Sequence, residues 1–209
     1  MGAMNTEQIE ASLTDPYWRV RYDHALRTGY EPTPAQVERG LLDIDRDVRR
    51  AWALRIGYQP TPEQVERGLT DSAWPVRIAW SRRMDYEPTS EQVDRGLTDL
   101  AWPVRRIWAR RMDHGMGHEP TPAQVERGLA DTDWCVRRAW AQSTNYHPTP
   151  EQVERGLVDT DRDVRMFWAR RPDYDPTPAQ IERGLVDTDQ GVRMAWERRM
   201  DSEPTGPRM

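Results

Sequence analysis

Pro60 to Glu87 read PTPEQVERGLTDSAWPVRIAWSRRMDYE, and nearly the whole chain repeats this stretch with substitutions. A less regular copy from Met4 to Glu31 precedes the others. A fixed period of 20–50 residues is the signature of a repeat array. We therefore expect seven tandem repeats: 4–31, 32–59, 60–87, 88–119, 120–147, 148–175 and 176–203. They would form one domain over residues 4–203, with a cloning remnant at 1–3 and a tail at 204–209.

The start of the repeat predicts a short helix. Thr61 is a good N-cap, Pro62 fits the first helical position, and Gln64 can return the capping hydrogen bond. Leu69 then falls on the apolar face. Gly68 lies beside that face, and its missing side chain would let another helix come close.

The second half of the repeat predicts a second helix. Asp71 is the expected cap, and Val76, Ala79, Trp80 and Arg83 follow at the spacing of one helical face. Neither face of such a helix–turn–helix can be buried without a neighbour, so the copies must stack.

Asp71, Val76 and Arg77, opening a second helix after a proline-led first helix, resemble the HEAT repeat and its short relative, the leucine-rich repeat variant. The resemblance covers all seven copies. It implies an all-α fold, an α-solenoid of tandem 28-residue repeats forming a right-handed superhelix, with first helices that are partly 3₁₀. One variant protein carries an iron–sulfur cluster on a cysteine motif that this chain lacks.

Composition narrows the functional class. The net charge is −5, and all 30 basic residues other than histidine are arginine. Cys135 is the single cysteine, which excludes a disulfide framework or a four-cysteine site. No apolar run approaches the roughly 20 residues of a membrane span. We expect a soluble, cytoplasmic protein without cofactor or metal.

Two charged columns recur in every copy, an Asp before the second helix and an Arg within it. They predict a structural ladder in which each Arg pairs with the Asp of an adjacent copy. An Arg stripe that binds phosphates or acidic peptides is the alternative. The ladder residues of the central copies are Asp43, Arg49, Asp71, Arg77, Asp99, Arg105, Asp131 and Arg137.

A third column is predicted to be core, because it shares a face with Val. It consists of Trp52, Trp80, Trp108, Trp140, Trp168 and Trp196. His24 takes this place in the first copy, as expected of an atypical terminal repeat.

Two positions that vary between copies lie opposite the core on a helical wheel, two residues before and two after the Val. Trp, Tyr and Arg are enriched at binding hot spots, so these positions predict a partner-binding surface. The alternative is that the tryptophans pack on the next repeat. The predicted binding residues are Trp18, Tyr22, Trp74, Ile78, Trp102, Arg106, Trp134 and Arg138.

An insertion, His114 to Gly117, interrupts the fourth copy and should perturb the stacking. Together with His118 and His147 it could supply metal ligands, but the spacing matches no strong metal motif.

No catalytic motif is present. The sequence thus favours a non-enzymatic scaffold that binds a protein or peptide through the second helices. A nucleic-acid-binding HEAT-like solenoid, such as a DNA glycosylase-like protein, is the alternative, although the acidic balance opposes it. Self-association through the same aromatic surface is a third reading.

Overall fold

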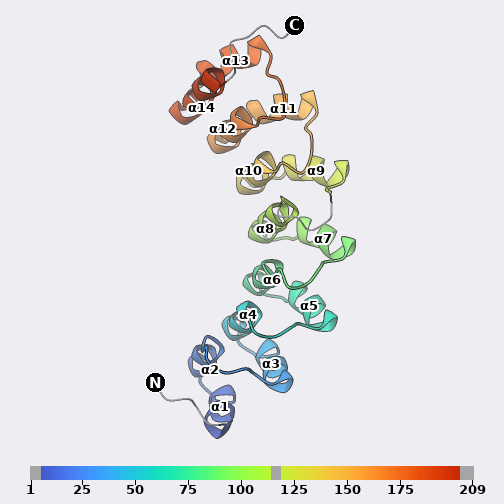
Figure 1. The fold of residues 1–209 in the computed structure, drawn as a ribbon, viewed down its shortest axis with the longest axis vertical. Coiled ribbons are helices and arrows are strands. Elements are labelled where there is room, and N and C mark those ends of the chain that lie inside the picture. Colours follow the sequence, from blue (N-terminus) through green and yellow to red (C-terminus); the bar gives the residue numbers. More distant parts are fainter. Residues whose placement is uncertain (1–5, 114–118, 203–209) are drawn as a thin grey trace. The chain divides into compact units, whose positions relative to one another are not determined.

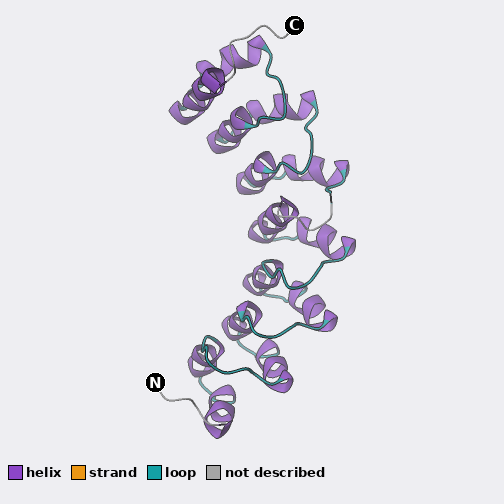
Figure 2. Ribbon diagram, viewed as in Figure 1, coloured by secondary structure: helices purple, strands orange, loops and turns teal. Residues whose placement is uncertain are grey.

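The chain folds into pairs of short helices, one pair for each repeat. The computed structural model describes residues 6–113 and 119–202, and these contain helices and loops but no strand (Figure 2). The first helices are α1 (Thr6–Leu13), α3 (Pro34–Leu41), α5 (Pro62–Leu69), α7 (Ser90–Leu97), α9 (Pro122–Leu129), α11 (Pro150–Leu157) and α13 (Pro178–Leu185). The second helices are α2 (Trp18–Ala25), α4 (Arg46–Leu54), α6 (Trp74–Ser81), α8 (Trp102–Asp113), α10 (Trp134–Gln142), α12 (Arg162–Arg170) and α14 (Gln190–Ser202).

Two compact units divide the chain, the first ending at Ile107 and the second beginning at Trp108. In the first unit α1, α3, α5 and α7 form one row, and α2, α4 and α6 form another (Figure 1). In the second unit α9, α11 and α13 stack in the same way, as do α10, α12 and α14. The predicted all-α solenoid is confirmed. The hand of the superhelix and the single domain over residues 4–203 stay predictions.

The first helices begin as the sequence predicts. Oγ1 of Thr61 accepts a hydrogen bond from the amide of Gln64 at 3.3 Å, and Oε1 of Gln64 accepts one from the amide of Thr61 at 3.1 Å. The same capping box opens α3, α7, α9, α11 and α13. These helices are α-helical throughout, so the expectation of partial 3₁₀ structure is wrong.

The second helices begin two residues later than expected. Asp71 does not cap α6; its Oδ1 accepts from the amide of Ala73 at 2.8 Å and so closes a turn ahead of the helix. Ala73 is the N-cap residue and offers no side-chain acceptor. In α4 the cap is Asp45, which accepts from the amide of Asp47 at 2.8 Å.

The tryptophan column is core, as predicted. Its six indoles are fully buried. Trp52, Trp80, Trp140, Trp168 and Trp196 pack against a glycine of the first helix of their own repeat. No helix in the described parts of the chain is long and apolar enough to cross a membrane.

The first repeat replaces the buried indole by a polar network. His24 is 1% exposed, its Nδ1 lies 2.8 Å from Oγ of Ser12, and its Nε2 is hydrogen-bonded to the hydroxyl of Tyr30. Burial, with Arg55 and Arg27 nearby, lowers the pKa of His24 to about 4, so the imidazole is neutral at pH 7.

Candidate partner-binding surface

The predicted Asp–Arg columns form inter-repeat ion pairs within the described residues. Nε and Nη2 of Arg77 donate to the two carboxylate oxygens of Asp99 at 2.7 and 2.8 Å. Nη1 donates to the carbonyl oxygen of Asp71 at 2.7 Å. The Asp99 carboxylate raises the pKa of Arg77 above its usual value. These groups are engaged with each other, so they do not offer an Arg stripe to a ligand.

The Asp–Arg ladder joins an Arg to the Asp of the following repeat. The pairs are Arg21–Asp43, Arg49–Asp71, Arg77–Asp99, Arg137–Asp159 and Arg165–Asp187. Arg105 donates to the carbonyl oxygen of Asp99 at 2.8 Å, and Asp131 accepts from the amide of Asp133 at 2.8 Å.

A second ladder connects the first helices, and the sequence did not predict it. Glu66 accepts hydrogen bonds from Nε2 of Gln92 at 3.0 Å and from Nη2 of Arg95 at 2.7 Å, both in the next repeat. Arg95 and Gln92 hold the pKa of Glu66 below its usual value. Equivalent contacts are made by Glu10, Glu38, Glu126 and Glu154. The glutamine that is the same in every repeat therefore has two roles, in the capping box and in this Glu–Gln–Arg ladder.

An arginine column closes the loops between repeats. Arg83 is buried between the rings of Tyr58 and Trp80, at 4.5 and 5.3 Å from their centroids. It donates to the carbonyl oxygens of Ala53 and Arg55 at 2.9 and 3.0 Å, at the end of the preceding second helix. Burial raises the pKa of Tyr58 to about 12. Arg55, Arg171 and Arg199 make corresponding contacts.

The predicted binding tryptophans lie at the N-terminal ends of the second helices. Trp74 is 46% exposed and Trp102 and Trp134 are each 39% exposed, whereas Trp18 is more covered. They begin α6, α8, α10 and α2. Half of each indole therefore remains open to a partner while the other half packs on the chain.

Ile78 does not belong to this surface. It is only 8% exposed, so the expectation that it points outward is wrong. A second helix of a solenoid has a neighbour on each side, and α6 packs against α4. A neighbouring helix covers the position four residues after Trp74, although a wheel for one helix places it opposite the core. At the equivalent position of α10, Arg138 reaches Asp163 of the next second helix, α12.

The remaining predicted residues differ in how firmly the chain already holds them. Arg138 pairs with Asp163 at 3.2 Å and lies 5.3 Å over the ring of Trp134. Tyr22 lies 6.0 Å from Trp18, ring to ring. Arg106 is half-buried, and its Nε has no hydrogen-bond partner. Arg138 is therefore held by an acid, whereas Arg106 makes none of the ion pairs found among the described residues.

Unpaired positive charge gathers on one stripe of the first unit. Its residues lie in α4, in α6 and at the start of α8, and Arg82 directly follows α6. Arg50 and Arg106 are half-buried, and the other residues of the stripe are exposed. Its arginines make none of the ion pairs found among the described residues, and Asp47 is the one acid that lies among them in α4. We call the following residues the first-unit stripe: Arg46, Arg50, Trp74, Arg82, Trp102 and Arg106.

A pocket of about 540 Å³ lies in the second unit, where the arginine column is interrupted. Ser143 stands at the arginine position, and Asp113 accepts instead from the amide of Thr144 at 2.9 Å. At the equivalent place in the first unit, Nε2 of Gln59 donates to the carbonyl oxygen of Asp85 at 2.6 Å. Glu119 replaces that glutamine, and a carboxylate cannot donate the bond.

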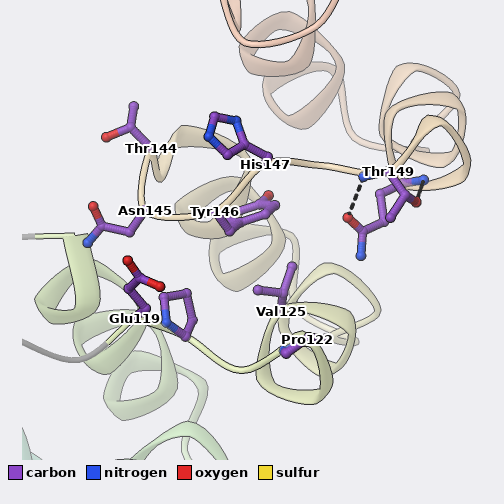
Figure 3. Close-up of a pocket in the computed structure, with 10 residues that line it drawn as sticks. Glu119, Pro122, Val125, Thr144, Asn145, Tyr146, His147 and Thr149 are labelled. Carbon is purple, nitrogen blue, oxygen red and sulfur yellow. Dashed lines mark hydrogen bonds between the residues drawn. The ribbon is translucent and has the colours of Figure 1, made fainter.

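Figure 3 shows Val125 and Tyr146 lining this pocket, next to the capping bonds between Thr149 and Gln152. His147 lines it too, whereas His114, Met116 and His118 of the suggested metal site lie outside the described residues. Among the residues that are described, no group of three or more His, Cys, Asp or Glu could hold a metal ion. Cys135 is buried.

No protein-family model and no curated protein matches the sequence. Among solved structures, the chain is similar to "a leucine-rich repeat variant with a novel repetitive protein structural motif", with a TM-score of 0.64 and 23% sequence identity. The match covers 94% of this chain and 72% of the other. At the level of fold, it confirms the resemblance found in the repeat motif.

Proposed function

We propose that this chain, which has the fold of a leucine-rich repeat variant, is a non-enzymatic scaffold for a protein partner. The partner binds at the N-terminal ends of the second helices. The observation that supports this proposal is that Trp74 and Trp102 are partly exposed and lie near arginines that have no ion pair. Trp and Arg dominate the energetics of protein interfaces when a partner desolvates them. The other repeated polar columns are already engaged in contacts between repeats.

Panning of a random peptide library on the full chain tests this function. The test variant carries Trp74→Ala and Trp102→Ala. The matched control carries Ile44→Ala and Leu100→Ala, which remove side chains that are 91% and 99% exposed but lie in the turns before the second helices. We expect peptides that are enriched on the natural chain and on the control, and lost on the tryptophan variant.

Equal enrichment on both variants, or none on the natural chain, would overturn the proposal. Melting curves on the same samples ensure that a loss of binding does not reflect unfolding. A dimer that the tryptophan variant converts into a monomer would identify the partner as a second copy.

A further inference from the structure

The distribution of charge over the first unit differs from that of the whole chain. The net charge of the chain is −5. On the first helices the arginines are neutralised, since Arg39, Arg67 and Arg95 pair with glutamates of the preceding repeat. Glu63 and Glu91 add exposed negative charge there. Uncompensated positive charge is therefore a property of the second-helix side.

On that side the first-unit stripe combines basic and aromatic side chains from three successive repeats. α4 presents Arg46 and Arg50, α6 presents Trp74, and α8 presents Trp102 and Arg106. Arg82 follows α6. A guanidinium binds a carboxylate in a planar, two-point geometry, as Arg49 binds Asp71 within this chain. Acidic side chains are thus the complement of the two ends of the stripe, and an apolar side chain is the complement of its centre.

The spacing of the repeats selects the shape of the partner. Packed helices are about 8–10 Å apart. A polyproline II segment rises about 3.1 Å per residue and presents the same side every third residue, about 9 Å further on. A β-strand presents the same side every second residue, after about 6.6 Å. The first of these two periods matches the step from α4 to α6 to α8.

We propose that the first-unit stripe binds an extended acidic segment of another protein, with an acidic residue at position i, an apolar residue at i+3 and an acidic residue at i+6. The two acids meet Arg50 and Arg106, and the apolar residue packs on Trp74. This inference rests on the proposed function and names the class of partner. The net negative charge of the whole chain disfavours binding of a long polyanion. A short acidic segment needs to contact only the stripe.

Fluorescence anisotropy with a labelled synthetic peptide, Glu-Pro-Pro-Leu-Pro-Pro-Glu, tests the proposal on the full chain. One control peptide carries Lys in place of both Glu, and another has the same composition with the two Glu adjacent. We expect the spaced acidic peptide to bind at least about tenfold more tightly than either control. Its binding should weaken as salt rises.

Variants of the chain locate the site. Arg50→Gln and Arg106→Gln should each weaken binding at least about threefold, and Trp74→Ala about tenfold or more. Arg162→Gln, an equal change of charge at an exposed arginine of the second unit, should leave it unchanged. Equal affinity for the spaced and adjacent peptides, or equal effects of Arg50→Gln and Arg162→Gln, would overturn the proposal.

The two proposals can fail separately. If the library test yields tryptophan-dependent peptides that lack the acidic spacing, the binding function stands and the acidic segment is wrong. Arg50-dependent binding of a single-stranded oligonucleotide, without binding of the peptide, would replace the protein partner by a nucleic acid. Dimerisation that is lost on Arg106→Gln would replace it by a second copy.

Discussion

Nε1 of Trp80 lies only 2.1 Å from the position that a Cβ on residue 68 would occupy, so the indole fits because residue 68 is glycine. The same relation holds between Gly40 and Trp52 at 2.2 Å. It recurs in three further repeats, in the pairs Gly128–Trp140, Gly156–Trp168 and Gly184–Trp196. In the first repeat both partners differ together, as Ser12 and His24. Glycine and tryptophan thus act as one structural unit.

Gly68→Ala should therefore destabilise the chain by about 1–3 kcal/mol, because the added methyl group overpacks a core that cannot relax without moving an indole. Urea unfolding followed by circular dichroism measures the loss. Introducing the residues of the first repeat provides the control. Gly68→Ser combined with Trp80→His should cost less than the sum of the two single substitutions. Additive costs would contradict the idea that the two positions act together.

Stability should fall with acidification as His24 of the unfolded chain takes up a proton. The pKa of His24 is lowered in the folded chain to about 4, whereas the unfolded chain binds the proton at about 6.5. The neutral form is therefore fully stabilising above pH 6.5, and this contribution is lost as pH falls towards 4. We expect a loss of about 2 kcal/mol between pH 7.5 and pH 5.

The measurement is urea unfolding at both pH values, with Ser12→Gly/His24→Trp as the control. That double variant copies the other repeats and should lose most of the pH dependence in this window. Histidine NMR on the folded chain should show one imidazole that stays neutral at pH 5. If the natural chain and the double variant lose the same stability, His24 does not cause the effect.

Arg77→Ala should cost about 2–4 kcal/mol, since it leaves the mostly buried carboxylate of Asp99 without its charged partner. Arg82→Ala is the matched control, because Arg82 is an exposed arginine outside the Asp–Arg ladder and should cost less than about 0.5 kcal/mol. Melting temperatures of the two variants give the comparison. Equal melting temperatures would mean that the ladder does not stabilise the stack.

Removing an exposed indole should be far cheaper than removing a buried one. We expect Trp80→Ala to cost about 3–5 kcal/mol, and Trp74→Ala, which is 46% exposed, less than half of that. Thermal melts of both variants test this expectation. A Trp74→Ala variant that melts as low as Trp80→Ala would make Trp74 core and remove the observation behind the proposed function.

The sequence predicted those features that depend on one repeat and its period. The capping box of Thr61 and Gln64, the buried Trp80 and the stacking of helix pairs all follow from local pattern. The start of α6 could not be placed, because Asp71 accepts a hydrogen bond equally well in a turn or at a cap. The Glu–Gln–Arg ladder was missed because capping already gave Gln92 a role.

The candidate surface shows the limit of a helical wheel. Trp74 and Ile78 are one turn apart on the same side of α6, yet one is half-exposed and the other is buried. The difference comes from the neighbouring helices, which a wheel for a single helix leaves out. The sequence also does not reveal which arginines lack an ion pair. Arg77 pairs with an Asp, whereas the four arginines of the first-unit stripe do not, and nothing in the sequence around them marks this difference.

The ladders also have a consequence for how the chain folds. In the described residues, the hydrogen bonds between repeats that form the ladders and loops above join residues 22 to 31 positions apart, as in Arg21 to Asp43 and Thr144 to Asp113. Such short separations give a low contact order, for which folding is fast and little loop entropy is lost before native contacts form. Folding can begin in any neighbouring pair of repeats and spread outward, so adding further copies would lengthen the protein without slowing its search for the native state.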